Sequence, residues 1–482
     1  MLRATSAASN KSSNFLNTDR LTDDVRLQLR EIVGEAQLFT DKGDCWPYGY
    51  DNSRRHAVPE AVVQPNSHKQ VVKIVALCHQ HNIPLTTRGR GTGTTGASVP
   101  TLGGVVLSTE RLDKILKVDP ANRVIVVEPG VTNQQVQNAA AEHGFFWPPD
   151  PTSAAFCSVG GNLAYNSAGP RAVKYGTTRD NVLGLRAVTG NGKEIRTGVY
   201  TSKGVVGLDL TRLLIGSEGT LAVITEATLK LTPQAETKRT MQATYRDIHS
   251  AAAAVSAIMA QPVTPCALEF IDGKAIEMIR DYSKANLPEN SAAMLMIEVD
   301  GLSADIDASA KKVANAARND GLIDITVARS KEEVASLWET RKALSPALRN
   351  VAPKKINEDV VVPVSELPAL IGGLSNLSRQ HNITIVNFGH AGNGNIHVNL
   401  LVNPDDPRQM QAAERCLDDV FDLVLTLNGT LSGEHGVGLE KRDFVSREID
   451  ATTLDLMRRI KAQFDPANIL NADKTLPLTD NC

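Results

Sequence analysis

The stretch GHAGNGNIHVN, residues 389–399, constrains the fold more than any other part of the chain, because it carries two histidines around an Asn-Gly pair. Asn-Gly between strand-like residues is typical of a two-residue type I′ hairpin turn, which fixes how its two strands pair. In that register His390 lies directly opposite His397, on the same face and with β-carbons about 5 Å apart. The alternation of strand side chains adds Asn399 to this face. The stretch therefore predicts a hairpin on which two imidazoles converge on one metal ion.

Two nitrogen ligands do not complete a metal site, so a third must come from elsewhere in the chain. The segment LSGEHGVG, residues 431–438, offers Glu434 and His435 in a glycine-rich loop that lets both side chains point into one cleft. The alternative is that His390 and His397 are exposed hairpin residues, and the presence of a second acid and histidine motif weighs against it.

The composition limits the classes of protein to consider. The chain has 482 residues, 42% of them hydrophobic and 22% charged, which predicts a globular protein of two or three domains. A net charge of -3 gives no basic face for nucleic acid, so a small molecule is the expected partner. Six cysteines without a C-x-x-C pair are typical of a reducing compartment and argue against a disulfide framework or a thiolate zinc site.

The first 18 residues are rich in serine and lack the apolar core of a signal peptide, so we expect a disordered tail there rather than a targeting segment. No stretch reaches the ~20 apolar residues of a membrane span. We therefore expect a cytoplasmic protein, with attachment to a membrane surface, and a mitochondrial location in a eukaryote, left open.

Local patterns predict a mixed α and β chain. A helix is expected after Ser67, strands at 105–109 and 123–130, and a helix at 132–144 that Thr132 caps. The expected divisions are a tail and lead-in at 1–54, a first domain at 55–235, a second α+β domain at 236–425 and a helical C-terminal segment at 426–482, in which Pro466 ends a helix.

Three glycine-rich segments lie in the first half of the chain, at 88–100, 150–184 and 214–221. The first, RGRGTGTTGASVP, follows a predicted strand and can present backbone N–H groups to a phosphate. It lacks both the dinucleotide fingerprint and the P-loop ending, and by itself the motif favours a plain glycine-rich turn. Three such segments together favour a large ligand that contains a pyrophosphate.

These segments together resemble the FAD-linked oxidases with a PCMH-type flavin domain, the vanillyl-alcohol-oxidase superfamily, from about residue 55 to the C-terminus. The resemblance implies an α+β fold with a two-lobed FAD-binding domain, a cap domain built on an antiparallel sheet and a helical C-terminal segment. It also implies FAD that is bound without a covalent link. The implied FAD contacts are Arg88, Gly89, Arg90, Gly91, Thr92, Gly93, Thr94, Gly96, Pro151, Ser158, Gly160, Gly161, Asn162, Asn166, Gly169, Glu218, Gly219 and Ile224.

The pair of motifs GHxGxGNxHxN and GEHGxG narrows the resemblance to the flavin-dependent D-2-hydroxy-acid dehydrogenases. This group includes D-lactate dehydrogenases, glycolate oxidase catalytic subunits and D-2-hydroxyglutarate dehydrogenases. The resemblance implies a divalent metal, zinc or manganese, and assigns the site as follows. The metal ligands are His390, His397 and Glu434, the base is His435, the substrate carboxylate is held by Arg341 with Lys355 nearby, and Asn399 donates a hydrogen bond. An ordinary solvated lysine is an equal alternative for Lys355.

The predicted activity is the oxidation of a D-2-hydroxy acid, with D-lactate as the first choice and D-2-hydroxyglutarate or glycolate as alternatives. Two other classes remain: a non-catalytic flavin-binding subunit, and a metal-binding structural domain without flavin. The electron acceptor is left open among cytochrome c, a quinone and an electron-transfer flavoprotein, and so is a homodimer.

Overall fold

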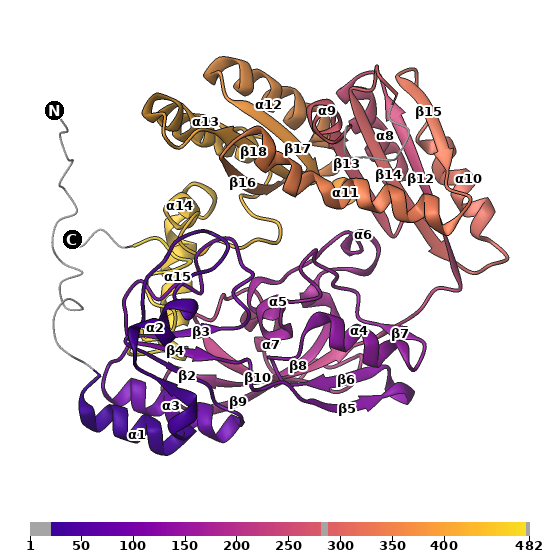
Figure 1. The fold of residues 1–482 in the computed structure, drawn as a ribbon. Coiled ribbons are helices and arrows are strands. Elements are labelled where there is room, and N and C mark those ends of the chain that lie inside the picture. Colours follow the sequence, from indigo (N-terminus) through magenta and orange to yellow (C-terminus); the bar gives the residue numbers. More distant parts are fainter. Residues whose placement is uncertain (1–20, 281–287, 479–482) are drawn as a thin grey trace.

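The computed structural model describes residues 21–280 and 288–478, in which helices pack against four sheets (Figure 1). The serine-rich start falls within residues 1–20, so the tail predicted there lies outside the described residues. The lead-in that follows contains helix α1 (Asp23–Val33), which packs on α3 (His68–Gln80), and a short α2 (Lys42–Cys45). Among the helices of the described ranges, none combines the length and the apolar character needed to cross a membrane.

The first lobe is a four-stranded sheet. Its order is β1 (Leu38–Phe39), β2 (Ala61–Val63), β4 (Val105–Ser108) and β3 (Leu85–Arg88). β2 and β3 run parallel to β4, and these three short strands are largely buried, as is usual for parallel strands. The helix predicted after Ser67 is confirmed as α3, which buries its apolar face under this sheet. The glycine-rich segment at 88–100 leaves the end of β3 and so begins at the edge of a rigid sheet.

The second lobe is a five-stranded antiparallel sheet. Its order is β5 (Ile115–Asp119), β6 (Val124–Val127), β10 (Ala222–Lys230), β8 (Val182–Thr189) and β9 (Glu194–Gly198). The helix predicted after Thr132 is confirmed as α4 (Asn133–Ala141), in which Thr132 and Gln135 form a reciprocal capping box. The remaining elements here are α5 (Val159–Tyr165), α6 (Ala172–Tyr175), α7 (Leu210–Leu214) and the pair β7 (Phe145–Phe146) with β11 (Thr232–Pro233).

The cap domain is a seven-stranded antiparallel sheet. Its order is β15 (Leu322–Val327), β12 (Thr237–Tyr245), β14 (Ala293–Gly301), β13 (Ala267–Asp272), β17 (Thr384–Gly389), β18 (Asn395–Val402) and β16 (Lys354–Val361). One face is covered by α8 (Ile248–Ala260), α10 (Ile306–Ala316), α12 (Leu367–His381) and α13 (Pro407–Thr426). The other carries α9 (Gly273–Ile279) and α11 (Lys331–Val351) and looks towards the first two lobes (Figure 1). The predicted α+β class with an antiparallel cap sheet is confirmed.

The C-terminal segment returns from the cap domain to the first lobe (Figure 1). After α14 (Val445–Glu448) and α15 (Ala451–Phe464) the chain turns at Pro466, and Leu470 forms a parallel bridge with Leu85 of β3. Ile469 and Leu470 are buried in the core of the first lobe. The loop 431–438, which carries the GEHG motif, is therefore held between the cap domain on one side and the first two lobes on the other.

Candidate active site

The hairpin that carries the two histidines differs from the predicted one. A 3-10 turn at Ala391–Asn393 and a left-handed Gly394, with φ of 72°, replace the type I′ turn, and Phe388 rather than His390 lies opposite His397. The predicted pairing is wrong because the N–H groups of Asn393 and Gly394 donate to carbonyls within the turn, which lengthens the loop. The register moves by two residues, and a shift of two keeps every side chain on its predicted face. The two imidazoles still meet, with ring centroids 5.3 Å apart.

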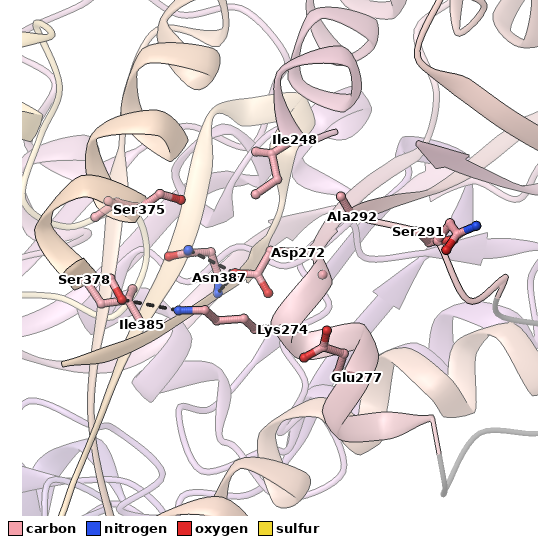
Figure 2. Close-up of a pocket in the computed structure, with 13 residues that line it drawn as sticks. Ile248, Asp272, Lys274, Glu277, Ser291, Ala292, Ser375, Ser378, Ile385 and Asn387 are labelled. Atoms are coloured by element: carbon pink, nitrogen blue, oxygen red, sulfur yellow. Dashed lines mark hydrogen bonds between the residues drawn. The ribbon is translucent and has the colours of Figure 1, made fainter. Parts of the chain in front are cut away.

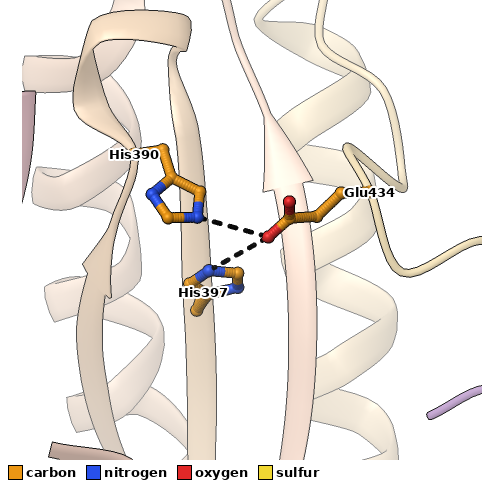
Figure 3. A group of neighbouring side chains, drawn as sticks. All are labelled: His390, His397 and Glu434. Carbon is orange, nitrogen blue, oxygen red and sulfur yellow. Dashed lines mark hydrogen bonds and ion pairs between the residues drawn. The ribbon is translucent and has the colours of Figure 1, made fainter. Parts of the chain in front are cut away.

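His390, His397 and Glu434 form a compact group of possible metal ligands (Figure 3). Their donor atoms all lie within 4.8 Å of one another. Glu434 Oε1 is 3.3 Å from His390 Nε2 and 3.7 Å from His397 Nε2, so the carboxylate points between the two rings. Two imidazole nitrogens and one carboxylate are a ligand set that zinc takes at sites with an open fourth position.

Glu269 on β13 joins this group to the cation predicted to hold a substrate carboxylate. Its carboxylate is fully buried, with Oε1 2.6 Å from His390 Nδ1 and Oε2 accepting a 2.7 Å hydrogen bond from Arg341 Nε. Burial alone would lower the pKa of His390, but the carboxylates of Glu269 and Glu434 outweigh it and raise that pKa to about 10. Burial, together with the charges of His435 and His390, lowers the pKa of His397 to about 3. The two histidines thus have opposite electrostatic surroundings.

The loop that carries Glu434 and His435 is held by hydrogen bonds to Asp359, a fully buried residue of β16. Asp359 Oδ2 accepts hydrogen bonds from three successive backbone N–H groups, those of Gly433 (2.9 Å), Glu434 (2.7 Å) and His435 (2.8 Å). Its other oxygen, Oδ1, lies 2.5 Å from Lys441 Nζ and 3.6 Å from His435 Nδ1. The His435 ring is stacked on that of His397, with centroids 5.1 Å apart.

The far end of the same loop is held from the second lobe. Glu218, which has a left-handed backbone at φ 52°, accepts hydrogen bonds from Val437 N–H (2.7 Å) and Gly438 N–H (2.8 Å). Burial raises the pKa of this carboxyl to about 7, against the opposing effect of the two N–H groups. Glu218 therefore connects the glycine-rich segment 214–221 to the loop 431–438, in addition to lining the cavity described next.

One large cavity, of about 1690 Å³, runs between the glycine-rich loops and the histidine group. His390, His397, Glu434, His435 and the predicted cations Arg341 and Lys355 all line it. The predicted FAD contacts that line it are Gly89, Arg90, Gly91, Thr92, Gly93, Thr94, Pro151, Ser158, Gly160, Gly161, Asn162, Gly169, Glu218, Gly219 and Ile224. Because ordinary small-molecule pockets measure roughly 300–1,000 Å³, this space has room for a dinucleotide and a substrate together. The structure thus brings the two groups of predicted residues into one cavity.

Four predicted site residues do not line this cavity. Arg88 donates to the carbonyl of Tyr50 behind the first loop, and the Asn166 side chain accepts from Arg179 N–H. Gly96 lies in the same loop, at φ 80°. Asn399 is fully buried within the sheet, where its amide donates to the carbonyls of Val386 and His397 at 3.1 Å each. Asn399 is therefore on the predicted face but lies behind His397.

Two glycines of the first-half loops are required by close packing. A β-carbon on Gly89 would lie 2.4 Å from Ser158 Oγ, and one on Gly160 would lie 2.7 Å from the Pro129 side chain. Thr87 Oγ1 and Asn471 Oδ1 are among the buried polar atoms of cavity-lining residues that have no hydrogen-bond partner among the described residues. Buried polar atoms are nearly always satisfied in the complete protein, so these two are consistent with a polar ligand bound here.

Sequence reasoning missed Glu269, Asp359 and Lys441. A signal existed for the first two, because Glu269 is the single acid of the apolar pattern CALEFI at 266–271, and Asp359 is one of two adjacent acids in the strand pattern INEDVVV at 356–362. Acids in such positions are costly unless they are paired. Lys441 gave no signal, because it follows a charged residue in a loop-like stretch and resembles any solvated lysine.

Comparison with known proteins agrees with this geometry. Residues 59–198 match the family model "FAD binding domain", and residues 234–475 match "FAD linked oxidases, C-terminal domain". The glycolate oxidase subunit GlcD of Bacillus subtilis is 37% identical over 455 residues, covering 94% of this chain and 97% of the relative. A D-lactate dehydrogenase of Archaeoglobus fulgidus is 35% identical over 436 residues, covering 89% and 95%.

The chain therefore belongs to the FAD-linked oxidases, as its motifs predicted, and its cofactor is FAD. A solved structure of p-cresol methylhydroxylase with bound substrate has the same fold, with a TM-score of 0.78 at 18% identity, covering 96% of this chain and 99% of the other. That of 4-ethylphenol oxidase from Gulosibacter chungangensis has a TM-score of 0.76, also at 18% identity, covering 95% and 98%. These two likenesses concern the fold alone.

Proposed function

We propose that this protein oxidises a D-2-hydroxy acid, D-lactate in the first place, to the 2-oxo acid. The observation that carries the proposal is that one cavity is lined both by the glycine-rich segments of the first half and by His390, His397, Glu434 and His435. A structural metal site has no need of a substrate-sized space beside it, and a flavin-binding subunit without activity has no need of the histidines. The relatives named as D-lactate dehydrogenases support the substrate class.

His435 is the residue we assign as base. Removing hydride from C2 of a hydroxy acid requires that the hydroxyl proton leaves as well. The buried carboxylate of Asp359 lies on the Nδ1 side of the His435 ring, which leaves Nε2 to take the proton. The charge of Asp359 also stabilises the imidazolium that results.

Arg341 is the residue we assign to the substrate carboxylate. It lines the cavity, and Glu269 holds its Nε, while its guanidinium lies 4.9 Å from the Phe388 ring centroid. Both contacts fix the direction of the side chain, and a fixed guanidinium orients a carboxylate better than a mobile one. Lys355 lines the same cavity and adds a second positive charge.

The residues of the cavity would hold two cofactors, FAD and a divalent metal ion. The first-half loops would hold FAD, which when bound accepts the hydride from C2. His390, His397 and Glu434 would hold a divalent metal, zinc or manganese, which when bound acts as a Lewis acid on the substrate oxygens. The donor chemistry of the three side chains fits such an ion, and Glu269 would hold His390 by its other nitrogen, as ligating histidines usually are held.

Glycolate is the second candidate substrate, because a relative named as a glycolate oxidase subunit is 37% identical to the chain. Glycolate and D-lactate differ by one methyl group, so the same clamp and base serve both. D-2-hydroxyglutarate is a further alternative that would need a cation for its second carboxylate.

The test is anaerobic mixing of the FAD-loaded protein with D-lactate, L-lactate, glycolate and D-2-hydroxyglutarate, with and without added Zn²⁺ or Mn²⁺. We expect one D-acid or glycolate to bleach the flavin absorbance, and metal to be required. His435→Ala should reduce its flavin at least a hundredfold more slowly while it keeps FAD bound. His143→Ala, at an exposed histidine of the second lobe, is the control and should react normally.

Each other class of function predicts a different outcome of this experiment. A yellow, metal-loaded protein that none of the four acids bleaches would show that the substrate class is wrong and would favour a non-catalytic flavin subunit. A His435→Ala variant that reduces its flavin at the normal rate would refute the role of the base.

A further inference from the structure

In the loop 431–438, every backbone N–H group from Gly433 to Gly438 donates to a side chain. The first three donate to Asp359 Oδ2, that of Gly436 donates to Ser432 Oγ at 3.0 Å, and the last two donate to Glu218. Three glycines in this short loop give it little conformational preference of its own. The conformation that aims the loop's side chains is therefore imposed by the residues that accept these hydrogen bonds.

Asp359 is the most important of these acceptors because its position is linked both to the histidine hairpin and to the loop that carries Glu434. In the pairing of β16 with β18, Asp359 lies directly opposite His397, so the two side chains share a face. The same carboxylate then binds the N–H of Glu434 and the N–H of the next residue, His435. One rigid strand position thus sets the distance between the histidine hairpin and the loop.

The charge of Asp359 is compensated where no water reaches it. Lys441 Nζ contacts Asp359 Oδ1 at 2.5 Å, Glu358 Oε2 at 3.2 Å and the carbonyl of Leu431 at 2.8 Å, and the Lys441 side chain is only 2% exposed. Lys441, which follows the loop in sequence, therefore binds both the first residue of the loop and the carboxylate that holds the rest of it. Hydrogen bonds to a charged group are about twice as strong as neutral ones, so this arrangement is stiff.

We propose that Asp359 is a positioning residue for catalysis, which sets the metal ligand Glu434 and the base His435 in place together, with Lys441 as its fixed counter-ion. This inference rests on the proposed function, because it assumes the roles given there to Glu434 and His435. Asp359 itself is not assigned to the metal or the substrate. If the inference holds, loss of its charge affects metal binding and catalysis beyond the effect on the stability of the fold.

A matched control exists on the opposite face of the same sheet. Asp272, 3% exposed, accepts hydrogen bonds from Ala275 N–H (2.8 Å), Asn387 N–H (2.6 Å) and the Asn387 amide (3.1 Å). It lines a separate cavity of about 320 Å³ at the end of β13, bordered by α8 and α12 on this face and by α9, which begins directly after Asp272 (Figure 2). Asn387 and Phe388 are neighbours on β17, so their side chains point to opposite faces, and only Phe388 lines the large cavity. Asp272→Asn therefore removes a buried carboxylate with three donors without touching the loop.

The experiment compares Asp359→Asn with Asp272→Asn in the full-length, FAD-loaded protein. Competition with a chromophoric chelator gives the dissociation constant for Zn²⁺, and steady-state turnover of the accepted substrate at saturating Zn²⁺ gives kcat and KM separately. We expect Asp359→Asn to bind Zn²⁺ about 10–100-fold more weakly, which is the usual effect of removing a group that orients a ligand. At saturating Zn²⁺ its kcat should stay at least tenfold low, because the base remains misplaced. Asp272→Asn should match the wild type in Zn²⁺ affinity and kcat.

If Asp359→Asn binds Zn²⁺ and turns over like Asp272→Asn, the inference is overturned while the proposed function stands. If the wild type itself binds no Zn²⁺, the metal role in the proposed function has failed, and the inference with it. If Asp359→Asn does not fold, Ser432→Ala decides, because Ser432 Oγ contacts Asp359 Oδ1 at 3.1 Å and binds Gly436 N–H. We expect it to weaken Zn²⁺ binding a few-fold, and an unchanged affinity would overturn the inference.

Discussion

Replacing Glu269 with glutamine tests whether one buried carboxylate serves both the metal ligand and the substrate clamp. The side chain is fully buried between His390 and Arg341, which it contacts at 2.6 Å and 2.7 Å. Glutamine keeps the shape and one acceptor oxygen but loses the charge. Each hydrogen bond to a charged group contributes roughly 1.5–3 kcal/mol, and the remaining oxygen can keep one bond at neutral strength. We therefore expect Glu269→Gln to lower the free energy of unfolding by about 3 kcal/mol.

The same substitution should change function in two separable ways. His390 loses the charged acceptor at Nδ1, so Zn²⁺ affinity should fall at least tenfold. Arg341 loses the contact that fixes its Nε, so KM for the substrate should rise even at saturating Zn²⁺. Urea denaturation, chelator competition and steady-state kinetics measure the three effects.

Glu298→Gln is the control for this prediction. Glu298 is a buried carboxylate on the same face, directly opposite Ala267, and it accepts hydrogen bonds from Thr240, Trp338 and Lys238. It should lose a similar amount of stability and keep its Zn²⁺ affinity. Should Glu269→Gln bind Zn²⁺ as tightly as Glu298→Gln does, the link between Glu269 and the metal ligand would be refuted.

Two further predictions concern other parts of the chain. Gly394→Ala places a β-carbon 1.9 Å from the Val362 carbonyl at a left-handed position, so it should destabilise the fold by about 3 kcal/mol in urea and weaken Zn²⁺ binding, and an unaffected variant would contradict the described turn. Burial raises the pKa of Asp272 from 3.8 to about 6, so the fold favours the protonated form. The stability that this group contributes is full below about pH 4 and is lost as the pH rises through 6, by about 3 kcal/mol. Asp272→Asn should lack this loss, and parallel stability curves for wild type and variant between pH 4 and 7 would refute the raised pKa.

The sequence predicted the site better where the pattern was local. Residues 389–399 placed His390 and His397 on one face correctly, because an error of two residues in register does not change the face. The turn itself was predicted wrongly, since Asn-Gly also suits a longer loop in which only the glycine is left-handed. Asn399 shows the limit of alternation, which gives the face of a residue and not its depth.

The residues that hold the site in place could not be found in this way. Glu269 and Asp359 contact His390, Glu434 and His435 across separations of more than 70 residues, and no spacing rule connects them. Their partners depend on the order of strands in the cap sheet, where β13 and β16 come to lie on either side of the histidine hairpin. Only the cost of an acid in an apolar strand was readable beforehand.

The charges around the site give a physical reason for the proposed metal. In the ion pairs of this region, four buried or nearly buried carboxylates meet two permanent cations. The carboxylates are those of Glu269, Glu358, Asp359 and Glu434, and the cations are Arg341 and Lys441. Buried charges without compensation are costly, so the cluster favours two further positive charges. A divalent ion held by His390, His397 and Glu434 would supply both and leave the two imidazoles neutral. His390, His397 and Glu434 line the cavity in which the oxygens of a 2-hydroxy acid also require positive charge. One ion bound by them would therefore both neutralise the buried carboxylates and stabilise the charge of the substrate.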